Sequence, residues 1–233
     1  MAELRLDKYL SDSAAGSRRE VREWIRAGRV SVGGTVVKRP EQKVDTSSAV
    51  TLDGNPLPYK AYLYLMLDKP EGLITATEDK RQRTVLDLLP PELRGKGLFP
   101  VGRLDKDTSG LLLLTNDGDF AHRVISPKKG VSKRYYAVVD GVPDEEDAAA
   151  FREGLTLGDG TRCLPAGLEC SGGSECWVTV QEGKYHQVKR MLASRGKPVL
   201  RLRRLSIGGL ELDPSLGPGG LRQLDEEELD KIF

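Results

Sequence analysis

The chain has 233 residues, of which 38% are hydrophobic and 30% charged, and its 36 Lys and Arg nearly balance its 35 Asp and Glu. This length can bury a core without disulfide or metal staples, and the composition is typical of a globular protein. No apolar run is long enough to span a bilayer, and charges stand near the N-terminus where a signal peptide needs an apolar core. We therefore expect a cytoplasmic protein.

The cysteines and histidines do not suggest a disulfide framework or a zinc site. Cys163, Cys170 and Cys176 are odd in number and form no Cys-x-x-Cys pair, and His122 and His186 are far apart in sequence. We therefore expect reduced structural cysteines and no bound metal. A histidine alone on a helix, such as His122, is expected at the surface or in packing.

Two short helices are expected near the N-terminus. The first is indicated by apolar residues at helical spacing, Leu6, Tyr9 and Leu10. The second begins at a capping box, Ser17 with Glu20, and carries Val21, Trp24 and Ile25 on one face until Gly28 ends it.

A hairpin follows, because residues 29–37 alternate around the turn Gly33-Gly34. The stretch 53–58 holds two prolines, a glycine and an asparagine, and is our candidate linker. Helix, helix and hairpin thus form a small module over residues 1–59, with a second domain over 60–233. The basic residues of the module could contact phosphates or form a solvated charged face.

This module resembles the S4-type RNA-binding domain. The resemblance covers about residues 4–53 and is carried by Arg-Leu-Asp-Lys-Tyr-Leu, Ser-Arg-Arg-Glu and Ile-Arg-Ala-Gly-Arg-Val-Ser-Val-Gly-Gly. It implies that RNA is contacted by the basic helix and the turn after it, here by Arg18, Arg19, Arg26 and Arg29.

The remaining sequence alternates short strands with short helices. Strands are expected at 62–67, 111–114, 133–139, 176–180 and 200–205, and helices at 84–89, 119–125, 144–153 and 182–192. The four leucines at 111–114 predict a strand buried on both faces. The pattern as a whole predicts an α+β fold.

The loop before that buried strand carries a candidate nucleophile. Asp105 stands between Arg103 and Lys106, and neighbouring cations favour an ionised carboxylate. From composition alone the loop could be an ordinary Asp-rich connection. A hydrolase using Asp105 and Asp107 as a carboxylate pair is a further alternative, although nothing else suggests a sugar-binding cleft.

The run from Gly102 to Gly118 resembles the signature of pseudouridine synthases, with Gly-Arg-Leu-Asp followed by Thr-Ser-Gly-Leu. Two more segments match, Lys-Arg-Tyr at 133–135 and Tyr-His-Gln-Val-Lys-Arg-Met at 185–191. The resemblance implies that Asp105 is catalytic, that Tyr135 stacks on the target base and that Lys189 pairs with the aspartate, with Arg190 as a competing candidate. It also implies that Arg103 holds the flipped nucleotide.

A fourth family element is the Asn-Lys-Pro-x-Gly turn that supports the active site. Here it reads Asp68-Lys69-Pro70-Glu71-Gly72, so Asp68 replaces the usual Asn and the hydrogen bonding of Lys69 is left open. We include Lys69 among the expected RNA-binding residues.

Together these segments imply a catalytic domain built on a mixed, largely antiparallel sheet. The motif spelling is most similar to the small-subunit (RsuA) branch, which implies isomerisation of one uridine in 16S rRNA by a monomer that needs no cofactor or metal. A basic stretch, with eight Lys or Arg and no acid between Lys184 and Arg204, fits an RNA partner. A large-subunit (23S) rRNA target and a noncatalytic ribosome assembly factor remain alternatives.

Overall fold

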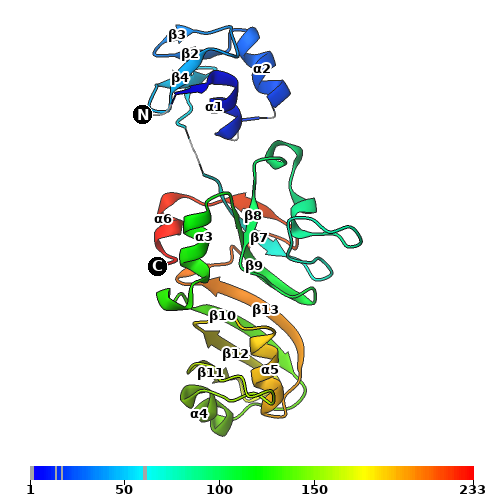
Figure 1. Cartoon of the computed structure of the whole chain (residues 1–233). Helices are drawn as coiled ribbons and strands as arrows, with labels where there is room; N and C mark the ends of the chain where they lie inside the picture. The colour runs from blue at the N-terminus through cyan, green and yellow to red at the C-terminus, as the bar shows by residue number, and fades with distance from the viewer. Residues whose placement is uncertain (1–2, 14, 17, 60–61) are drawn as a thin grey trace. The chain divides into compact units, whose positions relative to one another are not determined.

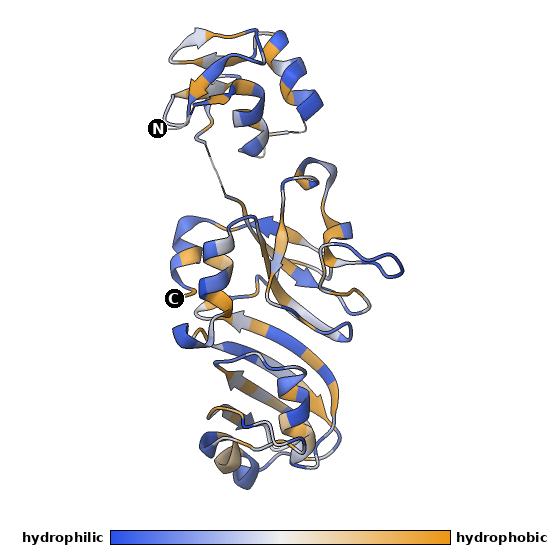
Figure 2. Ribbon diagram, viewed as in Figure 1, coloured by the Kyte–Doolittle hydropathy of each residue, from blue (hydrophilic) through white to orange (hydrophobic). Residues whose placement is uncertain are grey.

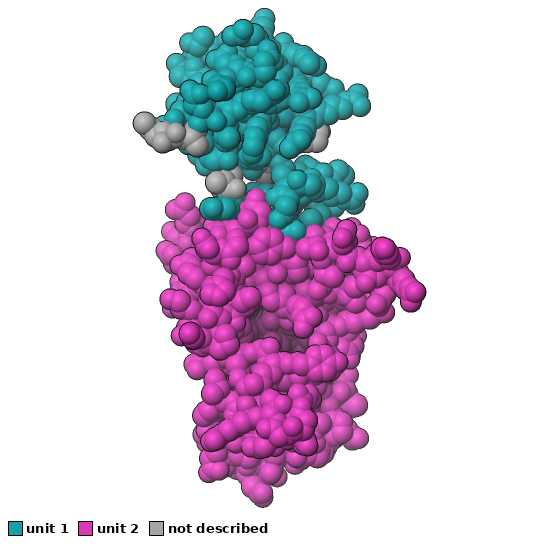
Figure 3. Space-filling view, in the orientation of Figure 1, with its two compact units in different colours: residues 1–63, 89–98 teal, residues 64–88, 99–233 magenta. Residues whose placement is uncertain are grey.

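The computed structural model describes residues 3–13, 15–16, 18–59 and 62–233 (Figure 1). It divides into two compact units, coloured separately in Figure 3. The first comprises Met1–Leu63 with Leu89–Leu98, and the second Tyr64–Leu88 with Phe99–Phe233. The segment 89–98, which the sequence placed in the second domain, thus clusters with the N-terminal unit.

The N-terminal unit packs two helices on short strands. The helices are α1 (Leu6–Asp12) and α2 (Arg18–Arg26). Strand β1 (Glu3–Arg5) pairs with β4 (Lys43–Asp45). A second sheet has the order β3-β2-β5-β6, with β2 at Val30–Val32, β3 at Thr35–Val36, β5 at Val50–Leu52 and β6 at Asn55–Pro56. Leu6, Tyr9, Leu10, Val21 and Ile25 are fully buried, as their spacing predicted. Ser17 of the expected capping box lies outside the described residues.

The expected linker at 53–58 is wrong. Leu52 pairs with Asn55 and Thr51 with Pro56, so the stretch forms the second half of a hairpin. Asp53 and Gly54 both have positive φ, 50° and 80°, as a two-residue hairpin turn requires. The turn-forming residues that suggested a linker therefore serve a tight turn inside the first unit.

The second unit contains a nine-stranded sheet in its described residues, with the order β11-β12-β10-β13-β9-β7-β15 and with β14 and β8 attached to β13 and β9. The strands are β7 (Tyr64–Lys69), β8 (Phe99–Val101), β9 (Thr108–Thr115), β10 (Lys133–Val139), β11 (Gly167–Cys170), β12 (Glu175–Val180), β13 (Val199–Ile207), β14 (Leu210–Glu211) and β15 (Leu221–Gln223). Among the pairings described, that of β9 with β13 is parallel and the others are antiparallel. The predicted α+β class with a mixed, largely antiparallel sheet is confirmed.

Strand β9 lies in the interior of this sheet. All eight of its residues are buried, and the apolar colour of the strand is visible in Figure 2. Strand β7 pairs along one edge, while β13 and β8 share the other edge, β13 beside Thr108–Gly110 and β8 beside Leu113–Thr115. The loop that carries Asp105 runs directly into this buried strand.

Gly110 allows β9 and β13 to approach closely. Its φ is 103°, and a Cβ at this position would lie 2.2 Å from the backbone oxygen of Arg204 and 2.7 Å from its nitrogen. Only glycine fits both the left-handed conformation and this space. The glycine of the Thr-Ser-Gly-Leu segment is therefore a requirement of the parallel pairing.

Each half of the sheet has its own core. Around β10, β12 and β13, helices α4 (Glu145–Glu153) and α5 (Gln187–Ser194) contribute Phe151 and Met191. Around β7 and β9, helix α3 (Gly118–Ile125) contributes Phe120. Short 3₁₀ turns occur at Val85–Leu88, Pro91–Leu93 and Pro127–Lys129, so the helix expected at 84–89 is a 3₁₀ turn.

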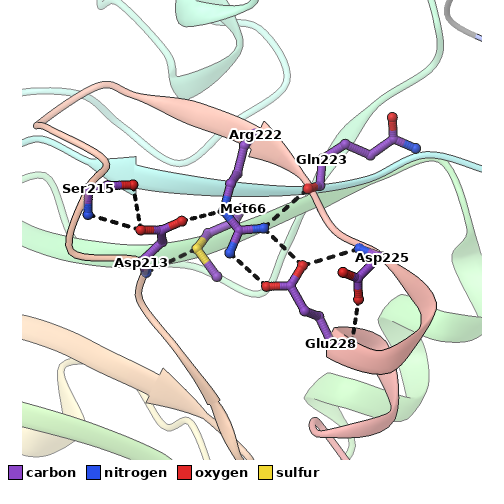
Figure 4. A network of polar contacts seen from close by, with 7 residues as sticks. All are labelled: Met66, Asp213, Ser215, Arg222, Gln223, Asp225 and Glu228. Carbon is purple, nitrogen blue, oxygen red and sulfur yellow. Dashed lines mark hydrogen bonds and ion pairs between the residues drawn. The ribbon is translucent and has the colours of Figure 1, made fainter.

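The C-terminal segment is fixed to the sheet by charged contacts around Arg222 (Figure 4). This β15 residue bonds to Asp213, with 2.6 Å between Nε and Oδ2, and to Glu228 of helix α6 (Glu226–Asp230), with 2.6 Å between Nη2 and Oε1. Glu228 also forms a capping box with Asp225. Acidic residues near the C-terminus therefore help to hold the last strand in place.

No helix in the described part of the chain is long and apolar enough to cross a membrane. The three cysteines are unpaired.

Candidate active site

A cavity of about 980 Å³ opens in the second unit, where Figure 3 shows the surface hollowed. Its lining includes the loop between β8 and β9, strands β10 and β13, and the start of α5 with the turn before it. Asp105, Tyr135 and Lys189 come from three of these segments and face the same space. Residues that are distant in the sequence thus meet as the motifs implied.

Two side chains contact the carboxylate of Asp105, which is partly exposed. Lys189 of α5 places Nζ 3.3 Å from Oδ2, and His186 places Nε2 3.3 Å from Oδ1. The expected pairing of Lys189 with Asp105 is present. The contact with His186 was not predicted, because the sequence analysis assigned no role to that histidine.

Lys189 also contacts Asp107, more closely than it contacts Asp105. Its Nζ lies 2.5 Å from Asp107 Oδ1, and this hydrogen bond lowers the pKa of Asp107 below its ordinary value. The Asp107 side chain is 74% exposed, whereas Asp105 lies inside the cavity. Asp107 therefore orients the lysine from outside, while Asp105 faces the enclosed space.

Arg204 lies beneath Tyr135 and was missed by the sequence analysis. Its Cζ is 5.9 Å from the centre of the Tyr135 ring, and its Nη1 donates to the tyrosine hydroxyl over 3.4 Å. Its Nε donates to the carbonyl of Leu111 over 2.7 Å, and the side chain is buried. A fixed cation thus supports the tyrosine from the floor of the cavity.

The backbone around Asp105 is held by two side chains. Lys69 is fully buried, and its Nζ donates to the carbonyls of Pro70, Asp105 and Thr108 over 3.0, 3.0 and 2.8 Å. Thr75 both donates to and accepts from the backbone of Leu104, over 2.7 and 3.2 Å. The loop is therefore rigid on both sides of Asp105.

The burial of Lys69 does not fit the expected contact with RNA. Its side chain has no exposed surface, and its three N–H groups have three carbonyl acceptors. Burial lowers the pKa of Lys69 to about 8, and the nearby carboxylate of Asp105 opposes this shift. Lys69 thus acts inside the protein, through the backbone of the aspartate loop.

Asp68, which replaces the usual Asn, forms an ion pair with an arginine of this chain. Asp68 is buried, and its Oδ2 lies 2.8 Å from Nη2 of Arg203 on β13. The hydrogen bonds of Lys69 do not involve Asp68. The substitution therefore forms an ion pair between β7 and β13 and leaves the support of the loop in place.

The two remaining arginines expected at the site are placed differently. Arg103 is exposed and lines the cavity beside Asp105. Arg190 is paired with Asp159, with 2.6 Å between Nη2 and Oδ2, and it does not line the cavity. Lys189 rather than Arg190 therefore contacts Asp105.

The four arginines expected to contact RNA from the N-terminal unit are all exposed. Arg19 pairs with Glu23 on the same helix, and Arg29 pairs with Asp53 and lies 5.3 Å from the centre of the Trp24 ring. Arg18 and Arg26 stand at the two ends of α2. In the second unit, the exposed His122 of α3 does not line the cavity.

No group of three or more His, Cys, Asp or Glu side chains that could hold a metal ion is found in the residues that the structure describes.

Comparison with known proteins assigns the chain to a family. Residues 63–194 match the family model for RNA pseudouridylate synthase, and residues 4–50 match that of the S4 domain. The chain belongs to the RNA pseudouridine synthase family and is an RNA pseudouridine synthase that carries an S4 domain.

The similarity extends over the whole length of several relatives. The chain is 46% identical to the uncharacterized RNA pseudouridine synthase YtzG of Bacillus subtilis, with 97% of each chain covered. It is 39% identical to ribosomal small subunit pseudouridine synthase A of Vibrio cholerae, over 99% of this chain and 100% of that one. A crystal structure of a pseudouridylate synthase, 34% identical, matches with a TM-score of 0.70 over 99% of this chain and 100% of that one.

Proposed function

We propose that this enzyme converts one uridine of small-subunit (16S) ribosomal RNA into pseudouridine. The observation that carries the choice of substrate is the full-length similarity to relatives named ribosomal small subunit pseudouridine synthase A, at 38–39% identity in Vibrio cholerae and Escherichia coli. The S4 domain gives the chain a second module suited to RNA. Family membership argues against a purely noncatalytic assembly factor.

The reaction detaches the base from its sugar, turns it and rejoins it through carbon 5. A stacked base cannot undergo this change, so the uridine must leave the stack, at a cost of a few kcal/mol. The cavity beside Asp105 is the place for the flipped nucleotide. Arg103, exposed at this cavity, is suited to hold it there.

Asp105 is the catalytic carboxylate in this proposal. Whether it attacks the anomeric carbon or the pyrimidine ring, or assists elimination at the sugar, it acts as an anion. Lys189 supports the anion, with its Nζ 3.3 Å from Oδ2 of Asp105. The loop held by Lys69 and Thr75 gives the carboxylate a fixed position, which is what an oriented nucleophile needs.

Tyr135 stacks on the target base and assists removal of the carbon-5 proton at the end of the reaction. Its ring lines the cavity, and Arg204 lies 5.9 Å from the ring centre and donates to the hydroxyl. No electrons are transferred and no group leaves the RNA, so the proposed chemistry needs no cofactor or metal.

The arginines of the N-terminal unit contact phosphates of the same RNA in this proposal, and the enzyme acts as a monomer. Arg18, Arg19, Arg26 and Arg29 are exposed, as phosphate contacts require. Such contacts make binding weaken as salt concentration rises.

The test is release of tritium from 16S rRNA transcribed with carbon-5-tritiated uridine. We expect release with the wild-type protein and none above background with Asp105→Asn, which still binds the RNA because the change removes one charge and no volume. An Asn variant with full activity would refute the role of Asp105. Mapping pseudouridines in rRNA from a strain that lacks the protein identifies the site, and a missing site in 23S instead of 16S rRNA refutes the proposed substrate.

A further inference from the structure

Two aromatic rings are stacked at the cavity in a position that the proposed chemistry does not use. Tyr185 and His186 lie with ring centres 3.9 Å apart and planes inclined by 18°, and both line the cavity. Tyr185 is 69% exposed. Within the described residues, the ring of Tyr185 stacks on that of His186.

The inner ring of the stack is fixed by the active site. His186 Nε2 lies 3.3 Å from Asp105 Oδ1, and the residue has a left-handed backbone with φ of 49°. For a residue other than glycine this conformation carries a cost and persists where the surroundings impose it. The stack therefore begins at the catalytic carboxylate and extends outward through Tyr185.

The turn that carries both rings is held in place by hydrogen bonds and an ion pair of the buried Glu182. The buried carboxylate of Glu182 accepts hydrogen bonds from the backbone of Leu164 over 2.9 Å and from Gln187 Nε2 over 2.7 Å, and it pairs with Lys184 Nζ at 2.5 Å. Gln187 in turn accepts from the backbone N–H of Lys184 over 2.9 Å. An exposed tyrosine on such a turn is held in advance of any ligand, so binding to it costs little ordering entropy.

We propose that Tyr185 and His186 form a stacking platform for the unpaired nucleobase that neighbours the flipped uridine in the RNA. The proposal rests on the proposed function, because it takes the uridine to be at Asp105. The nucleotide joined to that uridine leaves the cavity beside Asp105. Its path there passes His186 first and then Tyr185. Unpaired RNA bases are commonly recognised by stacking on aromatic side chains, which tolerates any base.

The charges around the two rings favour a nucleic acid as the ligand. Arg103, Lys106 and Lys189 line the same cavity, so a chain of phosphates is attracted to this opening. A nucleobase offers a flat face to Tyr185 while its phosphates remain near these cations. The platform would thus read the presence of an unpaired neighbour and not its sequence.

The kinetic test compares Tyr185→Ala with Tyr185→Phe, using tritium release from the 16S rRNA transcript. Stacking on an aromatic side chain is worth about 1–3 kcal/mol, which corresponds to a rise in KM of about 5- to 150-fold for Tyr185→Ala. We expect kcat to change by less than about threefold, since the substitution leaves Asp105, His186 and Lys189 in place. Tyr185→Phe keeps the ring and should retain the wild-type KM.

Leu200→Ala is the matched control, because Leu200 is also apolar and 70% exposed but does not line the cavity. It should leave KM and kcat unchanged. The thermal midpoints of all three variants should match the wild type, since each altered side chain is mostly exposed. A fall in kcat with unchanged KM in Tyr185→Ala would overturn the proposal, because it would mean that the ring only positions His186.

A binding measurement separates this proposal from that of the 16S substrate. A short uridine oligonucleotide with one central 2-aminopurine reports stacking through quenched fluorescence, whether or not 16S rRNA is the substrate. We expect quenching by the wild type, Tyr185→Phe and Leu200→Ala, and loss of quenching with Tyr185→Ala. Equal quenching by Tyr185→Ala refutes the platform, whereas absence of tritium release from 16S rRNA by the wild type refutes only the substrate.

Discussion

The ammonium group of Lys69 donates a hydrogen bond over 3.0 Å to the backbone carbonyl of Asp105, so the two residues are joined through the main chain. The lysine approaches the aspartate from within the protein, while Lys189 approaches its carboxylate from the cavity. Support of the loop and support of the charge are thus supplied by different lysines. This division makes the two contributions separable by mutation.

Replacing Lys69 with Met is expected to destabilise the protein and to lower its activity. The change leaves buried carbonyls of Asp105 and Thr108 without this donor, which we expect to cost about 2–4 kcal/mol of unfolding free energy. Urea unfolding measures the cost. Lys106→Met is the comparison, because Lys106 is exposed and donates to Gln82 over 2.8 Å, and its unfolding free energy should change by less than about 0.5 kcal/mol. Equal losses in the two variants would contradict the role of Lys69.

The contribution of Lys133 to the unfolding free energy, measured against a variant without this lysine, should become more favourable as the pH rises from about 8 toward 10.5. Burial, with the charge of Arg204, lowers the pKa of Lys133 from 10.5 to about 8 in the folded state. Between these values the unfolded chain binds more protons, so the unfolding free energy rises with pH, by at most about 1.4 kcal/mol per pH unit. Below about pH 8 both states are protonated and the contribution is constant.

The measurement is the difference in unfolding free energy between the wild type and Lys133→Met at about pH 7 and about pH 9.5. We expect the difference to shift in favour of the wild type by about 1–2 kcal/mol, because other ionisations, including that of Lys69, cancel between the two proteins. A difference that is independent of pH would show that Lys133 titrates normally.

Gly110→Ala is expected to cost about 3 kcal/mol or more in stability and to abolish activity. The added Cβ would lie 2.2 Å from the backbone oxygen of Arg204, at a φ of 103°. Gly118→Ala is the matched control, since Gly118 begins α3 and a Cβ there meets nothing within 4 Å. It should be neutral or stabilising by about 0.5 kcal/mol. Thermal unfolding of both variants measures the two changes in stability. A Gly110→Ala variant as stable as the wild type would mean that β9 and β13 can separate.

Loss of Arg203 should be more harmful than loss of the charge on Asp68. Arg203→Met leaves the buried Asp68 carboxylate unpaired, which we expect to cost about 3–5 kcal/mol, whereas Asp68→Asn should cost about 1 kcal/mol. The double variant should be more stable than Arg203→Met alone, because the buried charge is gone. Denaturant unfolding of the three variants measures this, and additive losses would disprove the coupling.

The sequence predicted which segments meet at the site because the motifs are contiguous and the strand periodicity is strong. Asp105, Lys189 and Tyr135 line one cavity, and β10 has the predicted bounds of 133–139. Strand β9 is buried on both faces, as four adjacent leucines implied. Their roles in the reaction remain proposals.

Arg204 was missed because no role was assigned to the arginines of the strand expected at 200–205. Tyr135 pairs with Arg204 and Arg134 with Ser206, so Leu205 is an extra residue that changes the register. Arg204 lies on the side of Leu202, and both are buried at the cavity. The adjacent pair Arg203-Arg204 was the available signal, since neighbours in a strand point to opposite faces.

The burial of Lys69 and the contact of His186 with Asp105 depend on backbone geometry that residue patterns do not encode. Lys69 is the last residue of β7 and points inward, although lysine is rarely buried. His186 reaches Asp105 from a left-handed conformation that helical periodicity does not predict. Both features required the long-range packing of the second unit.

The parallel pairing of β9 with β13 also affects the order in which this molecule is built. Thr108 pairs with Leu202, and the chain between them forms β10, β12 and α5. Bringing β9 and β13 together closes a long loop, and the entropy cost of closure precedes the stabilising contacts between the strands. The hairpin of β11 and β12 closes locally. Asp105 precedes one strand of this pair and Arg204 belongs to the other, so the cavity that both residues line is among the last features to form. On the ribosome, a chain in which β13 has not yet been synthesised therefore lacks Arg204 and one wall of this cavity.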